Sequence, residues 1–266
     1  MALVPAYDHI VVVVMENRDY KDIIGNKAEA PYVNELAAKG ALLTNYIAVA
    51  HPSLPNYYAL YAGRTFSVFD DEDYILHAPS LATVLKKAGK TFAGYVEHPN
   101  ATDSHQPWVS FQEGDDVERD FNTFPVGKFD SLPTVSFVIP NVDNDMHDGT
   151  IAQGDAWLKT NIDPYAKWAK DNNSLLILLW DETDDGDVNH VPVIFYGAHV
   201  KPGKNATLTN NYNVLSTILA AYKQVAPGHA ATAAIIDVFG RRGAPFKRPK
   251  LPPVRGPLTP HVVSID

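Results

Sequence analysis

Cysteine is absent from this chain of 266 residues. Its absence excludes disulfide bridges, thiolate nucleophiles and cysteine-based zinc sites. A chain without cysteine suits the cytosol, and equally a periplasmic or secreted bacterial protein that needs no bridges. Any metal site must therefore be built from oxygen and nitrogen ligands.

Basic side chains and long apolar runs are also scarce. The 22 Lys and Arg against 31 Asp and Glu give a formal net charge of −9, which disfavours nonspecific binding to nucleic acid or anionic membrane. No apolar run approaches the length of a bilayer span, and the first residues lack the regions of a signal peptide. We expect no nucleic-acid partner and no stable membrane insertion. The sequence fits a secreted or periplasmic mature form without its signal, with the cytoplasm as the other option.

Several common motifs are missing. The sequence contains neither a P-loop motif nor a GxGxxG after a strand, which excludes P-loop nucleotide binding and gives no support for a Rossmann site. It also lacks HExxH and the GxSxG elbow, so a zincin is excluded and a lipase-type serine hydrolase is disfavoured.

Short apolar segments alternate with segments of helical periodicity. This alternation predicts βαβ units and a mostly parallel sheet covered on both faces, that is, a three-layer α/β/α sandwich. We expect one domain over residues 1–240 and a basic, proline-rich tail over 241–266. Expected strands are 10–15, 41–50, 91–97, 134–140, 174–180 and 191–197, and expected helices are 30–40, 79–90, 155–173, 211–224 and 229–240. Long loops are expected at 66–78 and 98–133.

Acidic and amide side chains directly follow two of the expected strands. Glu16 and Asn17 come after 10–15, and Asp181 and Glu182 come after 174–180. Ligands in open α/β sheets bind outside the carboxyl ends of the strands, and such oxygens are the ligands that hard cations prefer. These four residues therefore predict one divalent-cation site. The alternative is that the acids merely cap turns.

Segment 51–63 carries a hydroxyl and an amide near an expected helix start. Ser53 would face a ligand at the helix N-terminus, and a metal-bound hydroxyl becomes a nucleophile. Asn56 could donate its amide to a phosphoryl oxygen. The competing interpretation is that Ser53 only caps the helix and Pro55 occupies its first turn.

Three histidines near expected strand ends are candidates for phosphate contact or proton transfer. His105 lies beyond the strand that ends at Glu97, and it is preferred over His98. His147 shares an acidic loop with Asp145, and His190 immediately precedes strand 191–197. A solvated acidic turn and a satisfied histidine at a strand start are the structural alternatives. His9 and His51 are expected to be structural, although His51 is near Ser53 in sequence, and His229 is expected to lie outside the site.

Four segments together resemble one known family. They are VVVVMENRDY, YVEHPN with HQPWVSF, VIPNVDNDMHD, and WDETDDGDVNHVPV. In this order they resemble the phosphoesterase family of bacterial and fungal acid phosphatases and phosphatidylcholine-type phospholipases C, which is similar in fold to the alkaline phosphatase superfamily. SLPNYYALYAG also resembles the nucleophile motif of nucleotide pyrophosphatase/phosphodiesterases.

The resemblance implies roles for individual residues. Ser53 would be the nucleophile and Asn56 a transition-state donor. The metal would bind Glu16, Asn17, Asp181, Glu182 and the Ser53 oxygen, while His105, His147 and His190 would contact phosphate or protonate the leaving oxygen. Gln106 stands where the family pattern has Asn, and Ser53 where it has Thr.

The resemblance predicts a metal-dependent acid phosphatase acting through a phosphoserine on small-molecule or lipid phosphate monoesters. The short chain favours this over a phospholipase C, whose large C-terminal additions are missing. The metal would be calcium, magnesium, manganese or zinc.

Three alternatives stay open. A phosphodiesterase or phospholipase C would use the same site, with an apolar groove formed by Tyr57, Tyr58, Tyr61 and Phe66. A sulfatase would need a Cys or Ser in a modification motif, which the sequence does not show. A noncatalytic binding protein stabilised by calcium would bind metal and leave phosphate esters intact.

Overall fold

The computed structural model describes residues 4–97, 105–184 and 188–240. The basic tail expected at 241–266 lies outside the described residues, and so does His98. Among the described residues, none of the helices combines the length and the apolar character that crossing a bilayer requires.

The core of the structure is an eight-stranded sheet with the strand order β4-β3-β5-β1-β6-β7-β2-β8. Its strands are β1 (His9–Met15), β2 (Ala41–Leu43), β3 (Phe92–Val96), β4 (Glu118–Asp120), β5 (Val135–Ile139), β6 (Ser174–Trp180), β7 (Val193–Gly197) and β8 (Gly203–Asn205). β7 runs antiparallel to β6 and β2, and the other strand pairs are parallel. The prediction of a mostly parallel sheet is confirmed.

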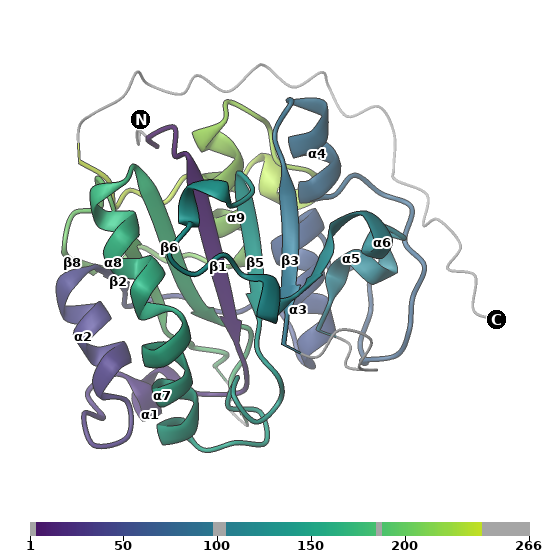
Figure 1. Cartoon of the computed structure of the whole chain (residues 1–266). Helices are drawn as coiled ribbons and strands as arrows, with labels where there is room; N and C mark the ends of the chain where they lie inside the picture. The colour runs from purple at the N-terminus through teal and green to yellow at the C-terminus, as the bar shows by residue number, and fades with distance from the viewer. Residues whose placement is uncertain (1–3, 98–104, 185–187, 241–266) are drawn as a thin grey trace.

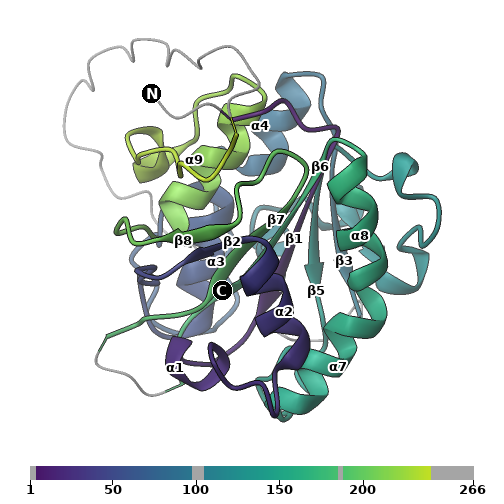
Figure 2. The same cartoon turned by 90° about the vertical axis from the view of Figure 1, so that its left-hand side faces the viewer.

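Helices cover both faces of the sheet (Figures 1 and 2). One face carries α2 (Pro31–Lys39), α7 (Ile151–Asn161) and α8 (Asp163–Asp171). The other carries α3 (Ser53–Ala62), α4 (Leu81–Lys87) and α9 (Asn211–Ala221). Short elements complete the chain: α1 (Tyr20–Ile23), α5 (Pro107–Ser110), α6 (Gly114–Val117), and the 3₁₀ turns η1 (Phe121–Thr123), η2 (Phe129–Ser131) and η3 (Gly228–Ala231). The arrangement is the predicted three-layer sandwich.

The two central strands form because their side chains are apolar and buried on both faces, as expected of parallel strands. Each fully buried valine or leucine contributes about 1.5–3 kcal/mol. β1 and β6 pair over seven residues, from His9 opposite Ser174 to Met15 opposite Trp180. Since the two strands end side by side, the residues that follow them lie close together at the carboxyl end of the sheet.

Local signals in the sequence place α2 and α4 correctly. Ser80 accepts a hydrogen bond from the Thr83 N–H at 3.1 Å, and the Ser80 N–H donates to Thr83 Oγ1 at 2.8 Å, which makes a capping box. Pro31 opens α2, and the helix ends before Gly40.

The long loop expected at 98–133 contains α5, α6, β4, η1 and η2 in its described part, and two other expected elements are shorter in the structure. The strand expected at 41–50 stops at Leu43, and only single bridges follow at Tyr46 and Ile47. The helix expected at 229–240 is wrong beyond the η3 turn. Side chains of α9 bind that backbone instead: Ser216 donates to the Ala233 carbonyl, Asn213 donates to the Ala234 carbonyl, and Thr217 accepts from the Ile236 N–H. These contacts satisfy the peptide groups without a helix.

Candidate active site

Acidic residues that follow three adjacent strands lie close together at the carboxyl end of the sheet. Glu16 follows β1, Asp181 and Glu182 follow β6, and Asp145 lies in the loop after β5; all four are buried. The Glu16 N–H donates to the Asp145 carbonyl at 2.9 Å, and the Asp181 N–H donates to the Met15 carbonyl at 2.9 Å. The backbone itself therefore holds these acids together.

Ser53 points toward these acids. Its Oγ lies 3.1 Å from Glu16 Oε2 and 2.9 Å from Glu182 Oε1. A hydroxyl has one proton, so it can donate fully to only one of the two carboxylates at a time. Ser53 is the first residue of α3 and follows the N-cap residue Pro52, and its hydroxyl bonds to Glu16 and Glu182. The interpretation of Ser53 as a mere helix cap therefore does not fit the structure.

Tyr57 contacts both Glu16 and His105. Its hydroxyl donates to Glu16 Oε1, and its ring stacks on His105 with 5.4 Å between ring centroids. His105 Nε2 lies 3.8 Å from the same Glu16 oxygen. From the sequence, Tyr57 was expected only to line an apolar groove. The available signal was its spacing, because residues four apart on a helix share a face and Ser53 is four residues earlier.

Crowded burial shifts the pKa values of the site. Burial, with Asp181 and Asp145 nearby, raises the pKa of Glu16 well above its usual range. Burial raises the pKa of Asp181 to about 6, and burial together with Asp181 raises the pKa of Glu182 to about 8. Burial and the neighbouring His147 lower the pKa of His105 to about 4. The close packing of these acids therefore favours their protonated, uncharged forms.

The donor set fits a divalent cation. Asn17 Oδ1 and Asp181 Oδ2 are buried without a hydrogen-bond partner in the described structure, a costly arrangement unless something else binds them. Ligand atoms of Glu16, His105 and Asp145 lie within 4.8 Å of one another. Carboxylate and amide oxygens with one imidazole suit calcium, magnesium, manganese or zinc.

The acids that adjoin Ser53 have histidine neighbours but no lysine or arginine partner among the described residues. Within residues 4–97, 105–184 and 188–240, neither Glu16, Asp181 nor Glu182 forms an ion pair with lysine or arginine. Glu182 Oε2 pairs with His51 Nδ1 instead. His51 was expected to be structural, and its position two residues before Ser53 was the signal for this contact.

Asn56 requires a correction. Its Oδ1 accepts from the N–H groups of Val49 and Ala50 at 3.0 and 3.1 Å, and its Nδ2 donates to the carbonyls of Ala50 and Pro52. Because the amide is fully engaged by backbone, it cannot also donate to a phosphoryl oxygen as expected. Asn56 instead holds the turn that brings Ser53 into place.

The other two expected histidines occupy different surroundings. The His147 ring lies 6.0 Å from the His105 ring, and its Nδ1 lies 2.6 Å from Asp148 Oδ1. His190 stacks on Tyr20 at 4.4 Å, and its buried Nε2 has no hydrogen-bond partner among the described residues. The structure therefore groups His147 with His105 and Glu16, while the contacts of His190 are with Tyr20 and the Ile47 backbone.

The apolar groove expected for a diesterase is not formed by the tyrosines of α3. Tyr58 and Tyr61 are buried, and their hydroxyls meet Ser110 Oγ and Glu113 Oε2. Both rings pack edge-on against Phe111. They belong to the aromatic core between α3 and α5 rather than to a surface that a substrate could contact.

Comparison with known proteins decides the class of this site. The family model described as the phosphoesterase family matches residues 26–224. The chain belongs to the phosphoesterase family. This phosphoesterase is 46% identical over 252 residues to phosphatidylinositol-3-phosphatase of Mycobacterium tuberculosis, a match that covers 89% of this chain and 84% of the relative.

Fungal relatives extend the comparison. The phosphoesterase is 31% identical over 250 residues to the phosphate-repressible acid phosphatase of Penicillium chrysogenum, covering 81% of this chain. It spans 59% of that relative's length. The phosphoesterase is thus a phosphoric ester hydrolase from a family that includes acid phosphatases.

Solved structures agree on the fold. A Vibrio parahaemolyticus protein in the alkaline phosphatase superfamily has a TM-score of 0.61 at 15% identity, covering 83% of this chain and 68% of that one. The phosphonate monoester hydrolase of Agrobacterium radiobacter has a TM-score of 0.56 at 12% identity, with coverages of 84% and 77%. The phosphoesterase has the fold of this superfamily.

Proposed function

We propose that this phosphoesterase is a metal-dependent acid phosphatase that hydrolyses phosphate monoesters through a phosphoenzyme on Ser53. One observation carries the proposal: the buried Ser53 hydroxyl contacts Glu16 and Glu182 at the sheet edge instead of capping its own helix. A hydroxyl placed among metal-type ligands is the arrangement that converts serine into a nucleophile.

Residues that directly follow β1 and β6, with the first residue of α3, would hold the metal. They are Glu16, Asn17, Ser53, Asp181 and Glu182, with His105 and Asp145 on the other side of Glu16. When bound, a divalent cation supplies positive charge that lowers the pKa of the hydroxyl and offsets the charge of the phosphate. The unpartnered oxygens of Asn17 and Asp181 support this set.

Ser53, an adjacent carboxylate and a histidine would have different roles in the reaction. Ser53 gives its proton to an adjacent carboxylate, its oxygen bonds to phosphorus, and the bond from phosphorus to the leaving oxygen breaks. A histidine protonates that oxygen; of the expected ones, His147 lies close to His105 and is accessible from solvent. Water then attacks phosphorus and gives a proton to that histidine, the bond from phosphorus to the Ser53 oxygen breaks, and the carboxylate returns its proton to Ser53 as inorganic phosphate leaves.

The substrate class follows from the relatives. One is named phosphatidylinositol-3-phosphatase and others are named acid phosphatases. We infer that the substrate is a small-molecule or lipid phosphate monoester. A secreted or periplasmic location stays a prediction.

Substitution of the nucleophile tests the proposal. Ser53→Ala should lower turnover of an aryl phosphate by about 10³-fold or more, the scale on which nucleophile removal acts. Acid-quenched wild-type protein should carry phosphate on the peptide that contains Ser53, as detected by mass spectrometry. Near wild-type turnover by a folded Ser53→Ala protein would remove the covalent mechanism.

A phosphodiesterase on the same site is the weaker alternative. The groove expected for it is absent at Tyr58 and Tyr61, which are buried. Comparing a monoaryl with a bis-aryl phosphate separates the two activities, and we expect the monoester to be the better substrate.

A further inference from the structure

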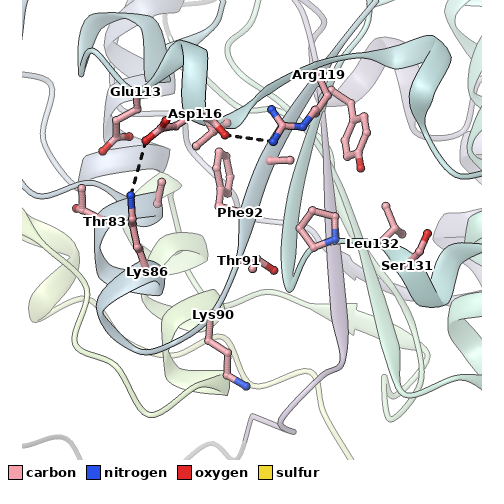
Figure 3. Close-up of a pocket in the computed structure, with 15 residues that line it drawn as sticks. Thr83, Lys86, Lys90, Thr91, Phe92, Glu113, Asp116, Arg119, Ser131 and Leu132 are labelled. Carbon is pink, nitrogen blue, oxygen red and sulfur yellow. Dashed lines mark hydrogen bonds and ion pairs between the residues drawn. The ribbon is translucent and has the colours of Figure 1, made fainter.

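A cleft lies beside the free edge of β3, away from the acids of the active site. It has a volume of about 740 Å³, within the range typical of sites for small organic ligands. β4 covers only Gly94 to Val96 of β3, so the first residues of β3 have no strand beside them on this side and border the cleft. We call this space the β3-edge cleft, and α4, β3, α6 and Ser131–Pro133 form its walls (Figure 3).

Basic side chains gather around this cleft although the chain as a whole is acidic. Lys86 comes from the end of α4, Lys90 precedes β3, and Arg119 belongs to β4. Figure 3 shows Phe92 between Lys86 and Arg119. Lys86 and Arg119 thus bring positive charge to either side of Phe92, while the Lys90 ammonium lies 5.7 Å from the centroid of the Tyr222 ring.

Acids offset these charges only in part, since the cleft is lined by Lys86, Lys90 and Arg119 against Glu113 and Asp116. Both carboxylate oxygens of Glu113 accept hydrogen bonds from hydroxyls, those of Ser80 and Tyr61. Asp116 lies 3.7 Å from Lys86 with both side chains about 80% exposed, and such an exposed pair contributes little. Arg119 donates only to the backbone carbonyls of Asp116 and Glu118 in the described structure.

We propose that the β3-edge cleft binds a small organic anion, a planar apolar body that carries one carboxylate, sulfonate or phosphate group. The apolar body would lie against Phe92 and Pro133, which are half-buried, and the anionic group would meet Lys86 or Arg119, with Lys90 adding positive charge at the rim. None of the lining residues is Ser53 or an acid of the active site. The site is therefore distinct from the catalytic one.

Titration with 8-anilinonaphthalene-1-sulfonate tests this, because the probe joins an aromatic body to one sulfonate and fluoresces when it is buried. The full chain should show one saturable site. Lys86→Glu with Lys90→Glu should weaken binding by about tenfold or more, the order expected when exposed charge contacts are reversed. The matched control is Lys201→Glu with Lys204→Glu, the same charge change at exposed positions outside the cleft, and it should bind as wild type does.

Three results from these titrations would overturn the proposal. They are unchanged affinity in the Lys86/Lys90 variant, an equal loss in the Lys201/Lys204 variant, and equally tight binding of the uncharged analogue N-phenyl-1-naphthylamine. Phe69 lies outside the cleft, and its side chain is 80% exposed. If Phe69→Ser abolished binding, the probe would be bound at Phe69 and not in the β3-edge cleft. Unchanged thermal transitions show that the variants fold. Since no turnover is measured, the result stands apart from the proposed phosphatase activity.

Discussion

The ring of Tyr57 stacks on the imidazole of His105, with 5.4 Å between centroids and 17° between planes. The hydroxyl of the same tyrosine donates to Glu16. One buried side chain on α3 thus orients both an acid that contacts the nucleophile and a histidine beside it. Tyr57 is a positioning residue, since its hydroxyl and ring contact the groups that would meet the substrate or metal.

Tyr57→Phe should keep the stacked ring and remove the hydrogen bond to Glu16. Leaving a buried acceptor unsatisfied costs about 1–3 kcal/mol, so we expect kcat to fall by about tenfold and metal affinity to weaken. Steady-state kinetics and a metal titration measure both. Tyr58→Phe is the control, because it removes a hydroxyl that bonds to Ser110 in the core and should change stability alone. Identical kinetics for the two variants would rule out the positioning role.

Asp145→Asn should weaken binding of the divalent cation. Asp145 is buried beside Glu16 and His105, and its Oδ1 accepts from the His147 N–H at 2.8 Å. We expect a loss of about tenfold or more, as for other changes around metal ligands, measured by calorimetric titration of the chelator-treated protein. Asp143→Asn alters an exposed acid of the same loop and should leave the affinity unchanged. Equal affinities in all three proteins would place the metal elsewhere.

Stability of the metal-free protein should fall as the pH rises from 6.5 to about 8. The folded pKa of Glu182 is about 8 against an ordinary 4.5, so in this window the folded state holds more protons than the unfolded one and loses stability as they leave. His105, with a folded pKa of about 4 against 6.5, acts in the opposite direction only below pH 6.5. Thermal melts in chelator should show the decline, and Glu182→Gln should flatten it. A melting temperature that rises over this range would contradict the assignment.

Gly94→Ala should destabilise the fold. A Cβ on Gly94 would lie 2.1 Å from the Trp108 side chain, and that indole is buried and donates to Glu118 Oε2 at 2.8 Å. Overpacking of this kind costs about 1–3 kcal/mol, measurable as a lower midpoint in urea at constant slope. At Gly114 the nearest atom to a Cβ is 3.8 Å away, so Gly114→Ala should be tolerated. Equal midpoints would show that Trp108 can move.

The convergence of the acids was predictable because it depends on strands whose apolar runs are unmistakable. β1 and β6 end within a residue of their expected ends, and Glu16 and Asp181 follow them directly. Parallel strands place such residues at a common edge whatever the rest of the chain does. Ser53 was found by a similar argument, since it opens a helix on the same edge.

Contacts made by side chains across the fold were not predictable in this way. Asn56 was expected to face a substrate, but the turn at 49–52 has peptide groups that need partners, and the amide supplies them. The helical pattern at 229–240 was overruled by hydroxyl and amide groups of α9. Both depend on which distant segment lies alongside, and a local pattern does not contain that information.

The seven-residue ladder between β1 and β6 has a consequence for evolution and engineering. A slip of one residue in this pairing would turn every side chain of one strand to the opposite face, and it would carry Asp181 away from Glu16 and Met15. A single inserted residue inside β6 should therefore abolish activity even if the sheet still forms. The long connection around 66–78 carries no such constraint on the ladder, so changes in chain length should accumulate there.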